Sequence, residues 1–236
     1  MIFGVILGGG IGSRMGNTDK PKQFLQIGKK PILIHTLEKM IINERFDRVI
    51  VTCPDQWMAY TKDMINKFLP DCDVDIILGG ATRNGTILNS ILHVEKNYGL
   101  DDETVVVTHD AVRPFVTQRI LDENIDAAIN GVACDTVIPA ADTIVESING
   151  EVISCIPNRA HYYQGQTPQS FKAKMFKDLY ESMSEEDKEV LTDACKVFVV
   201  HGLDVTIVKG ETFNNKVTYP YDLRLAETLL GGNDQC

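Results

Sequence analysis

Short apolar segments alternate with longer amphipathic ones over residues 2–138, and this alternation constrains the fold more than any other feature of the chain. Five segments are nearly continuous in apolar residues, as strands buried on both faces of a parallel sheet are: 2–7, 48–53, 74–78, 104–110 and 131–138. The segments between them repeat apolar residues at helical spacing, over 31–43, 56–69, 83–99 and 117–131. This order predicts an α/β fold with a doubly wound, mostly parallel, Rossmann-like sheet.

The alternation breaks near residue 140. Residues 142–156 alternate in polarity about Asn149-Gly150, and an Asn-Gly pair in such a setting is a strong signal for a β-hairpin. We interpret this hairpin as a protruding arm, at about 139–163, of a single domain over residues 1–236. Further segments follow the arm, with helical patterns at 171–183, 184–191, 193–202 and 221–232 and a strand at 204–210.

The net charge of −10 argues against general binding to nucleic acid or to an anionic membrane, but it leaves room for a local basic pocket that binds a small polyanion. The N-terminal segment has no basic stretch before its short apolar run, and no segment has the length of a membrane span, so a cytoplasmic protein is expected. Six cysteines without a C-x-x-C pair are typical of free thiols that pack in a core: Cys53, Cys72, Cys134, Cys155, Cys195 and Cys236.

The first predicted strand leads into a loop with four glycines in five residues, Gly8-Gly9-Gly10-Ile11-Gly12. Ligands of α/β folds bind at the carboxyl ends of the strands, and such a loop lets backbone N–H groups approach phosphate oxygens. Its spacing matches neither G-x-G-x-x-G nor the P-loop. Cations follow at Arg14, Lys20 and Lys22, so the sequence predicts a phosphate-binding loop. The alternative is a strand-to-helix turn with solvated charges.

Other polar residues follow the later strands. Asp110 ends an otherwise apolar strand, where it could bind Mg²⁺ together with phosphates, or else cap the next turn. His109 beside it is expected to pack or cap rather than to catalyse. Further candidates follow other segments: Gly79, Gly80, Arg83, Thr86, Arg159, Thr167, Gln169 and Lys216.

Together these motifs resemble those of a known family. "GGGIGSRMG", "GGATRNGT", "THDAVRP", "QTPQSF", "LTDAC" and "NNKVTYPYDL" have the order and spacing of the cytidylyltransferases that activate sugar-alcohol phosphates. Over roughly residues 2–230 the chain resembles the family of 2-C-methyl-D-erythritol 4-phosphate cytidylyltransferase, with its nucleotidyltransferase fold. It resembles the ribitol-5-phosphate cytidylyltransferase branch more closely, because erythritol-type enzymes usually have Ala-Ala-Gly where this chain has Gly8-Gly9-Gly10.

The resemblance implies an enzyme that transfers CMP from CTP to D-ribitol 5-phosphate with Mg²⁺, yielding CDP-ribitol for teichoic acid or another cell-wall glycan. It also implies a homodimer formed through the arm, without nucleic-acid or membrane partners. One alternative is 2-C-methyl-D-erythritol 4-phosphate as the acceptor. A hexose-1-phosphate nucleotidyltransferase would lack "QTPQSF" and "NNKVTYPYDL", and a non-catalytic nucleotide-binding protein would be expected to have lost Lys22, Asp110 or Lys216.

The resemblance also assigns roles to residues. The implied catalytic residues are Arg14, Lys22, Arg159 and Lys216, and the implied metal ligand is Asp110. The implied CTP-binding residues are Leu7, Gly8, Gly9, Gly10, Ile11, Gly12, Ser13, Gly80, Ala81, Thr82, Arg83, Asn84, Gly85, Thr86, Asp110 and Ala111. The implied acceptor-binding residues are Thr143, Arg159, Thr167, Thr192 and Lys216. Because the arm packs against a second subunit in the family, Thr143 and Arg159 are candidates for either subunit's pocket.

Overall fold

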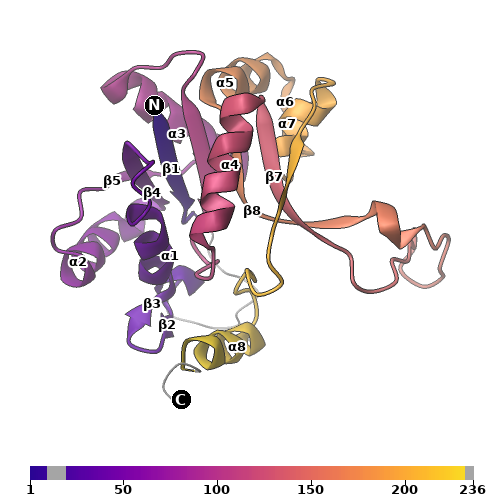
Figure 1. The fold of residues 1–236 in the computed structure, drawn as a ribbon, viewed down its shortest axis with the longest axis horizontal. Coiled ribbons are helices and arrows are strands. Elements are labelled where there is room, and N and C mark those ends of the chain that lie inside the picture. Colours follow the sequence, from indigo (N-terminus) through magenta and orange to yellow (C-terminus); the bar gives the residue numbers. More distant parts are fainter. Residues whose placement is uncertain (10–19, 232–236) are drawn as a thin grey trace.

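The computed structural model describes residues 1–9 and 20–231, and a seven-stranded sheet in the order β5-β4-β1-β6-β8-β7-β9 lies at its centre (Figure 1). Every strand of this sheet except β8 runs in the same direction, so the predicted mostly parallel sheet is confirmed. The strands are β1 (Ile2–Leu7), β4 (Arg48–Cys53), β5 (Asp75–Leu78), β6 (Val105–Asp110), β7 (Ala133–Pro139), β8 (Tyr163–Lys172) and β9 (Thr206–Lys209). A separate antiparallel pair consists of β2 (Gln26–Ile27) and β3 (Lys30–Pro31).

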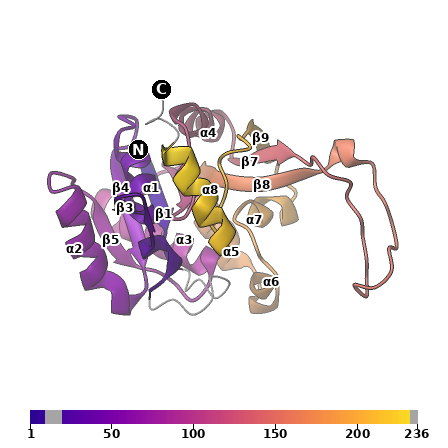
Figure 2. The same cartoon turned by 90° about the horizontal axis from the view of Figure 1, so that it is seen from below.

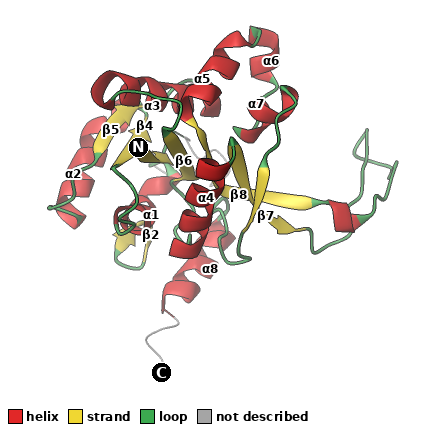
Figure 3. Ribbon diagram, turned by 45° about the horizontal axis from the view of Figure 1, so that its top comes forward, coloured by secondary structure: helices red, strands yellow, loops and turns green. Residues whose placement is uncertain are grey.

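Helices cover both faces of the sheet, as a doubly wound fold requires (Figure 3). The apolar cluster on one face includes residues of α1 (Ile32–Ile41), α2 (Met58–Phe68) and α4 (Gln118–Asn130). The cluster on the other face includes residues of α3 (Arg83–Tyr98), α5 (Ala173–Ser182) and α7 (Cys195–Val200). The remaining helical segments are η2 (Lys22–Phe24), η3 (Asp55–Trp57), η4 (Arg159–His161), α6 (Glu185–Glu189) and α8 (Pro220–Gly231). None of the described helices is both long and apolar enough to cross a bilayer.

Strand β8 is absent from the sequence-based prediction, which also began a helix at residue 171, two residues too early. Its polar residues and Pro168 hide the two-residue apolar period that identifies a strand. Nevertheless, residues 166–172 are buried between β6 and β7, and β8 pairs antiparallel with both strands. Hydrogen bonds from its glutamine and threonine side chains compensate for their burial.

The arm, residues 140–162, extends away from the sheet in both perpendicular views (Figures 1 and 2). The predicted Asn149-Gly150 turn is present, since Gly150 has a φ of 75° and the Asn149 side chain accepts from two following backbone N–H groups. The two limbs of this hairpin pair sparsely, because the described pairing between them is a single antiparallel bridge between Glu146 and Cys155. An isolated two-stranded ribbon is marginal in water, and no described element of the chain covers this one.

The five described cysteines are free thiols, as predicted, but they do not all pack in the core. Cys53, Cys134 and Cys195 are buried. Cys155 is exposed on the arm, and Cys72 is partly exposed, so the prediction of a packing role fails for Cys155.

Candidate active site

The carboxyl ends of β1, β4 and β6 meet at one edge of the sheet, where Leu7 pairs with Thr52 on one side and with Asp110 on the other. The N–H of Gly8 donates to the Thr52 carbonyl oxygen at 3.1 Å. A Cβ atom on Gly8 would collide with that oxygen, so this close approach requires glycine. The Gln23 side chain also donates to the Gly8 carbonyl at 2.6 Å. The start of the predicted phosphate loop is therefore fixed against β4.

Only part of that loop is placed by the structure. Leu7, Gly8 and Gly9 end β1 and lie at this edge. The other predicted loop residues lie outside the described residues: Gly10, Ile11, Gly12, Ser13 and Arg14.

A second glycine turn, which contains Gly79 and Gly80 and follows β5, leads to Thr86. A Cβ atom on Gly9 would lie 3.8 Å from the Thr86 hydroxyl, so the two glycine turns lie close together. The Thr86 hydroxyl accepts from the Gly80 N–H and donates to the Thr82 carbonyl, each at 2.9 Å. Thr82 in turn caps helix α3 by accepting from the Gly85 N–H at 3.0 Å. The predicted CTP-binding residue Thr86 therefore shapes this turn.

Three basic side chains surround the carboxylate of Asp110. Lys216 Nζ lies 3.0 Å from Asp110 Oδ2, Arg113 Nε lies 3.3 Å from the same oxygen, and Arg83 Nη2 lies 3.7 Å from Oδ1. Burial would raise the pKa of Asp110, but the attraction of Arg83, Lys216 and Arg113 outweighs burial and holds that pKa far below its usual value. The carboxylate is therefore ionised, and the group keeps surplus positive charge suited to phosphates.

Arg113 is a site residue that sequence reasoning missed, although it lies within the "THDAVRP" motif. It is 9% exposed, and its guanidinium donates to the Asn214 carbonyl at 2.8 Å besides contacting Asp110. Asn214 donates to the Thr167 carbonyl at 2.9 Å. These bonds hold the loop that carries Lys216 against the end of β6. In the sequence, Arg113 stands alone as a charge between Val112 and Pro114, and this pattern could have marked it as a site residue.

His109 is fully buried, which fits the predicted packing role. Burial lowers the pKa of its imidazole to about 4, so the ring is neutral near pH 7. Its Nε2 lies 3.0 Å from the Arg113 carbonyl oxygen, and its Nδ1 lies 2.9 Å from the Thr167 hydroxyl. The same hydroxyl accepts from the Asp110 N–H at 3.1 Å.

Two lysines that are close in sequence have different surroundings. Lys22 lies in η2, directly before the residue that holds the Gly8 carbonyl, and is 8% exposed. Lys20 is exposed, donates to the Tyr60 hydroxyl at 3.1 Å and lies 4.6 Å from the centre of that ring. Lys22 is therefore buried next to the residue that holds Gly8, whereas Lys20 packs on α2.

The predicted acceptor-binding residues divide into two groups. Thr167 and Lys216 lie at Asp110. Thr143 and Arg159 are exposed on the arm, where the Arg159 guanidinium donates to the Ala141 carbonyl. Thr192 is exposed in the loop before α7.

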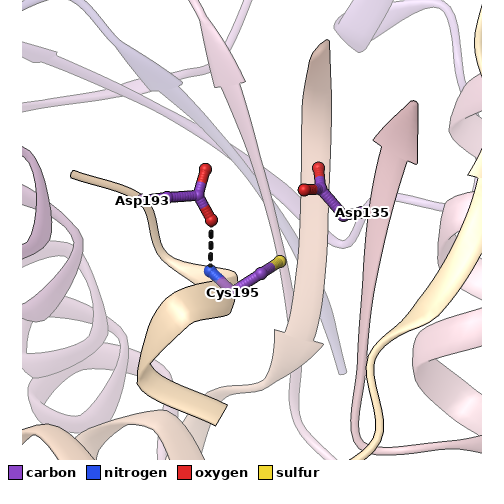
Figure 4. Close-up of side chains that lie close together, drawn as sticks. All are labelled: Asp135, Asp193 and Cys195. Carbon is purple, nitrogen blue, oxygen red and sulfur yellow. Dashed lines mark hydrogen bonds between the residues drawn. The ribbon is translucent and has the colours of Figure 1, made fainter. Parts of the chain in front are cut away.

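A partly buried acidic network includes Asp193, the residue that follows Thr192. Figure 4 shows Asp135, Asp193 and Cys195, whose potential ligand atoms lie within 4.8 Å of one another. The amide nitrogen of Gln169 donates to Asp135 at 3.1 Å and to Asp193 at 2.5 Å, and Asp193 also accepts from the Cys195 N–H. Because an N–H donor bridges the two carboxylates, we interpret this network as an anchor for the start of α7. Burial and the neighbouring Asp193 raise the pKa of Asp135 to about 7.

The residues at Asp110 fit a magnesium ion. Arg83 Nη2 lies 3.7 Å from Asp110 Oδ1, which is beyond hydrogen-bond range. One carboxylate oxygen together with phosphate oxygens and waters is a usual ligand set for Mg²⁺. The surrounding cations favour a metal that arrives with the negative charge of a nucleotide.

Comparison with known proteins agrees with this geometry. A family model described as 2-C-methyl-D-erythritol 4-phosphate cytidylyltransferase matches residues 2–232. A 4-diphosphocytidyl-2C-methyl-D-erythritol synthase from Anaerococcus prevotii DSM 20548 has 26% identity and a TM-score of 0.79, with 97% of this chain and 95% of that chain covered.

Two further solved structures support the fold alone. The 2-C-methyl-D-erythritol 4-phosphate cytidylyltransferase from Thermus thermophilus has 24% identity and a TM-score of 0.71, with 96% of this chain and 97% of that chain covered. The corresponding enzyme from Francisella tularensis has 23% identity and a TM-score of 0.77, with 95% and 97% covered.

Proposed function

Because this chain belongs to the 2-C-methyl-D-erythritol 4-phosphate cytidylyltransferase family, and is thus a nucleotidyltransferase, we propose that it transfers CMP from CTP to the phosphate of a small polyol phosphate. The observation that carries this proposal is the group at the end of β6. There, one ionised carboxylate lies among three basic side chains, beside the glycine turn that follows β1.

The chemistry of the reaction fits a site made of cations. A phosphate oxygen of the acceptor attacks the α-phosphorus of CTP, the bond to the bridging oxygen breaks, and pyrophosphate leaves with the negative charge. A phosphate monoester is mostly dianionic at neutral pH, so no general base is needed. The difficulty is to bring two anions together in line, which requires positive charge and fixed positions.

The site residues divide this task in the proposal. Asp110 would hold Mg²⁺, which supplies further positive charge to the nucleotide phosphates. Lys22 and Arg14 would contact the triphosphate and stabilise the departing pyrophosphate. Lys216, whose Nζ lies 3.0 Å from Asp110, would contact the acceptor phosphate close to that metal. Arg159, exposed on the arm, would complete the acceptor site from one of two subunits.

Two acceptors are distinguished by different observations. The matched family and the named structures favour 2-C-methyl-D-erythritol 4-phosphate. The ribitol-type motifs favour D-ribitol 5-phosphate, which remains our prediction together with a role in teichoic acid or another cell-wall glycan. Gly8 is one of the residues on which the ribitol-type resemblance rests, and a Cβ atom there would collide with the Thr52 carbonyl oxygen.

A coupled assay of pyrophosphate release tests the reaction and the acceptor together. The protein would be given CTP and Mg²⁺ with D-ribitol 5-phosphate, 2-C-methyl-D-erythritol 4-phosphate, a hexose 1-phosphate or no acceptor. We expect release with D-ribitol 5-phosphate and not with the hexose phosphate. Faster release with the methylerythritol phosphate would replace the predicted acceptor with the one that the comparisons favour. No release with any acceptor would refute the proposed reaction.

A further inference from the structure

The side chain of Gln23 contacts the start of the predicted phosphate loop from inside the protein. Its Nε2 donates to the Gly8 carbonyl oxygen at 2.6 Å, and Gln23 is 2% exposed, so water does not compete for this bond. The next residue, Phe24, anchors this segment, because its ring packs against those of Trp57 and Tyr60 at centroid distances of 5.2 and 5.1 Å. The Gly8 carbonyl is therefore held by a segment that the core immobilises.

Gly8 is held a second time by strand β4. Its N–H donates to the Thr52 carbonyl oxygen at 3.1 Å and to the Thr52 hydroxyl at 3.2 Å. Both backbone polar groups of Gly8 are thus bonded within the protein. The next backbone donor along the chain is the N–H of Gly9, which is exposed, and no residue in 1–9 or 20–231 accepts from it.

The bond from Gln23 determines where that N–H points. The peptide bond between Gly8 and Gly9 is trans, so the N–H of Gly9 points opposite to the carbonyl of Gly8. Because Gln23 holds the carbonyl on the side of η2, the N–H is directed away from η2. Without this bond the peptide plane could rotate easily, because a glycine on each side restricts φ and ψ little.

From this geometry we infer that Gln23 is a positioning residue for CTP, which holds the Gly8 carbonyl and thereby aims the N–H of Gly9 at the nucleotide. The identity of the ligand in this inference rests on the proposed function. CTP offers acceptor oxygens on its ribose and phosphates, and a donor that is already oriented binds them without a further cost in ordering. Gln23 itself does not touch CTP, and the adjacent Lys22 keeps its separate role at the triphosphate.

The first test measures the order of the Gly9 backbone and does not depend on activity. Nitrogen-15 relaxation of the full-length protein without nucleotide gives the order parameter of the Gly9 amide. We expect about 0.85, as for rigid backbone, in the unmodified protein and less than about 0.6 in Gln23→Met. Methionine has a similar length but no donor for the Gly8 carbonyl. An unchanged order parameter in Gln23→Met would overturn the inference.

Gln26→Met is the matched control. Gln26 lies further along the same segment, in β2, and its side chain is exposed. The control makes the same chemical change away from the loop, so the order parameter of Gly9 and the affinity for CTP should equal those of the unmodified protein. Equal losses in both variants would mean that methionine disturbs this segment in general, and the inference would fail.

The second test measures CTP binding. Isothermal titration calorimetry with CTP and Mg²⁺, in the absence of acceptor, gives the Kd of the nucleotide. We expect Gln23→Met to raise this Kd about tenfold, the usual effect of losing one well-placed hydrogen bond. In steady-state kinetics the CTP KM should rise by a similar factor. Both kcat and the acceptor KM should change less than about twofold, because a contact made equally in the ground state and the transition state affects binding alone.

The alternatives give different results. A fall in kcat with unchanged affinity for CTP would mean that Gln23 acts on Lys22 rather than on Gly9, and the inference fails. Should Gln23→Met fail to fold, as judged by circular dichroism, titration of the unmodified protein with CTP still decides, since we expect the Gly9 amide signal to shift. If CTP shifts other amide signals but not that of Gly9, the inference alone is refuted. If CTP shifts no signal, the proposed function fails together with the inference.

Discussion

At the scale of single residues, positive charge is concentrated around Asp110 in a chain whose net charge is negative. The single carboxylate of Asp110 faces three basic side chains, which leaves a surplus of two positive charges in a protein of net charge −10. Because Arg113 and Asp110 are buried, solvent screens this surplus less than it would at the surface. The positive charge around Asp110 is therefore neutralised only when an anion binds there.

The two lysines around Pro21 allow a matched comparison. If Lys22 meets charge that builds on the triphosphate during the attack, Lys22→Ala should lower kcat by on the order of 10²–10³, about 2.7–4 kcal/mol, by analogy with the loss of one preorganised donor. The CTP KM should change less than kcat, because the interaction is stronger in the transition state. Steady-state kinetics at saturating acceptor would measure both constants.

Lys20→Ala is the control for that substitution. Lys20 packs on Tyr60 rather than beside the Gly8 loop, so its loss should change kcat little. Pro21 fixes the backbone between the two lysines, and one is not expected to replace the other. Equal and mild effects of both substitutions, with unchanged thermal stability, would mean that this stretch is a solvated basic turn.

Asp135 should make the stability of the protein depend on pH. In the folded protein its pKa is raised to about 7 from an ordinary value near 3.8, so the unfolded chain loses this proton first as pH rises. This group therefore destabilises the fold progressively from about pH 4 to about pH 7, and the full penalty persists above that range. Asp135→Asn keeps an oxygen for Gln169 but cannot ionise.

Urea unfolding of Asp135→Asn and of the unmodified protein at pH 5 and pH 8 measures this penalty. We expect the variant to be more stable at pH 8 by on the order of 1–3 kcal/mol, since one pKa unit corresponds to about 1.4 kcal/mol. The gain should be smaller at pH 5. A gain that is independent of pH, or a loss at pH 8, would contradict the assignment.

At the scale of elements, the predicted strands and helices are those whose side chains follow a simple apolar period. β1, β4 and β6 are continuous apolar runs in the core of the sheet, and their ends place the Gly8 turn and Asp110 together as predicted. β8 could not be predicted in this way, because its stability depends on hydrogen bonds of Gln166 and Gln169 to distant residues. A local pattern does not reveal partners 24 or 45 positions away.

The site shows the same limit. Asp110 and Lys216 stand out as single charges at the ends of apolar or turn segments, and the structure brings them to 3.0 Å. The roles of Arg113 and His109 depend on which backbone carbonyls face them, and those carbonyls are set by the tertiary fold. Residue types indicate charge and ligand class, whereas the direction of each hydrogen bond requires the structure.

The arm is the element with the clearest missing partner. Ile148 is 90% exposed and Val152 is 67% exposed. The two limbs of the arm are joined by one described bridge, which does not cover these side chains. We predict a homodimer in which each arm, at about residues 139–163, packs against its counterpart around a two-fold axis. Multi-angle light scattering should show a dimer at micromolar concentration, and a monomer would refute the prediction. Ile148→Asp combined with Val152→Asp should shift the dimer to monomer without loss of helical circular dichroism.

At the scale of the whole molecule, the division of acceptor residues between arm and sheet predicts a shared active site. If Arg159 serves the pocket of the partner subunit, Arg159→Ala and Lys216→Ala damage different halves of each site. Mixed dimers of the two variants then contain one intact site out of two. Random mixing should restore about a quarter of the unmodified activity, because half of the dimers are mixed.

Subunit exchange followed by the pyrophosphate assay measures this recovery. Each variant assayed alone gives the baseline, and exchange with an Asp110→Asn variant gives the control, since Asp110 and Lys216 belong to the same half-site. Mixing Lys216→Ala with Asp110→Asn should recover nothing. If Arg159→Ala and Lys216→Ala also fail to complement after exchange, both residues act within one subunit.

The position of β8 has a consequence for how this protein can vary in evolution. One insertion within β8 would turn every following side chain to the opposite face of the sheet, so Thr167 or Gln169 would lose its partners at Asp110 or at Asp193. The hydrogen bonds described for the arm join arm residues to one another, so a change of its length leaves that register intact. Insertions and deletions between related sequences are therefore expected to accumulate in residues 140–162 and to stop at Tyr163.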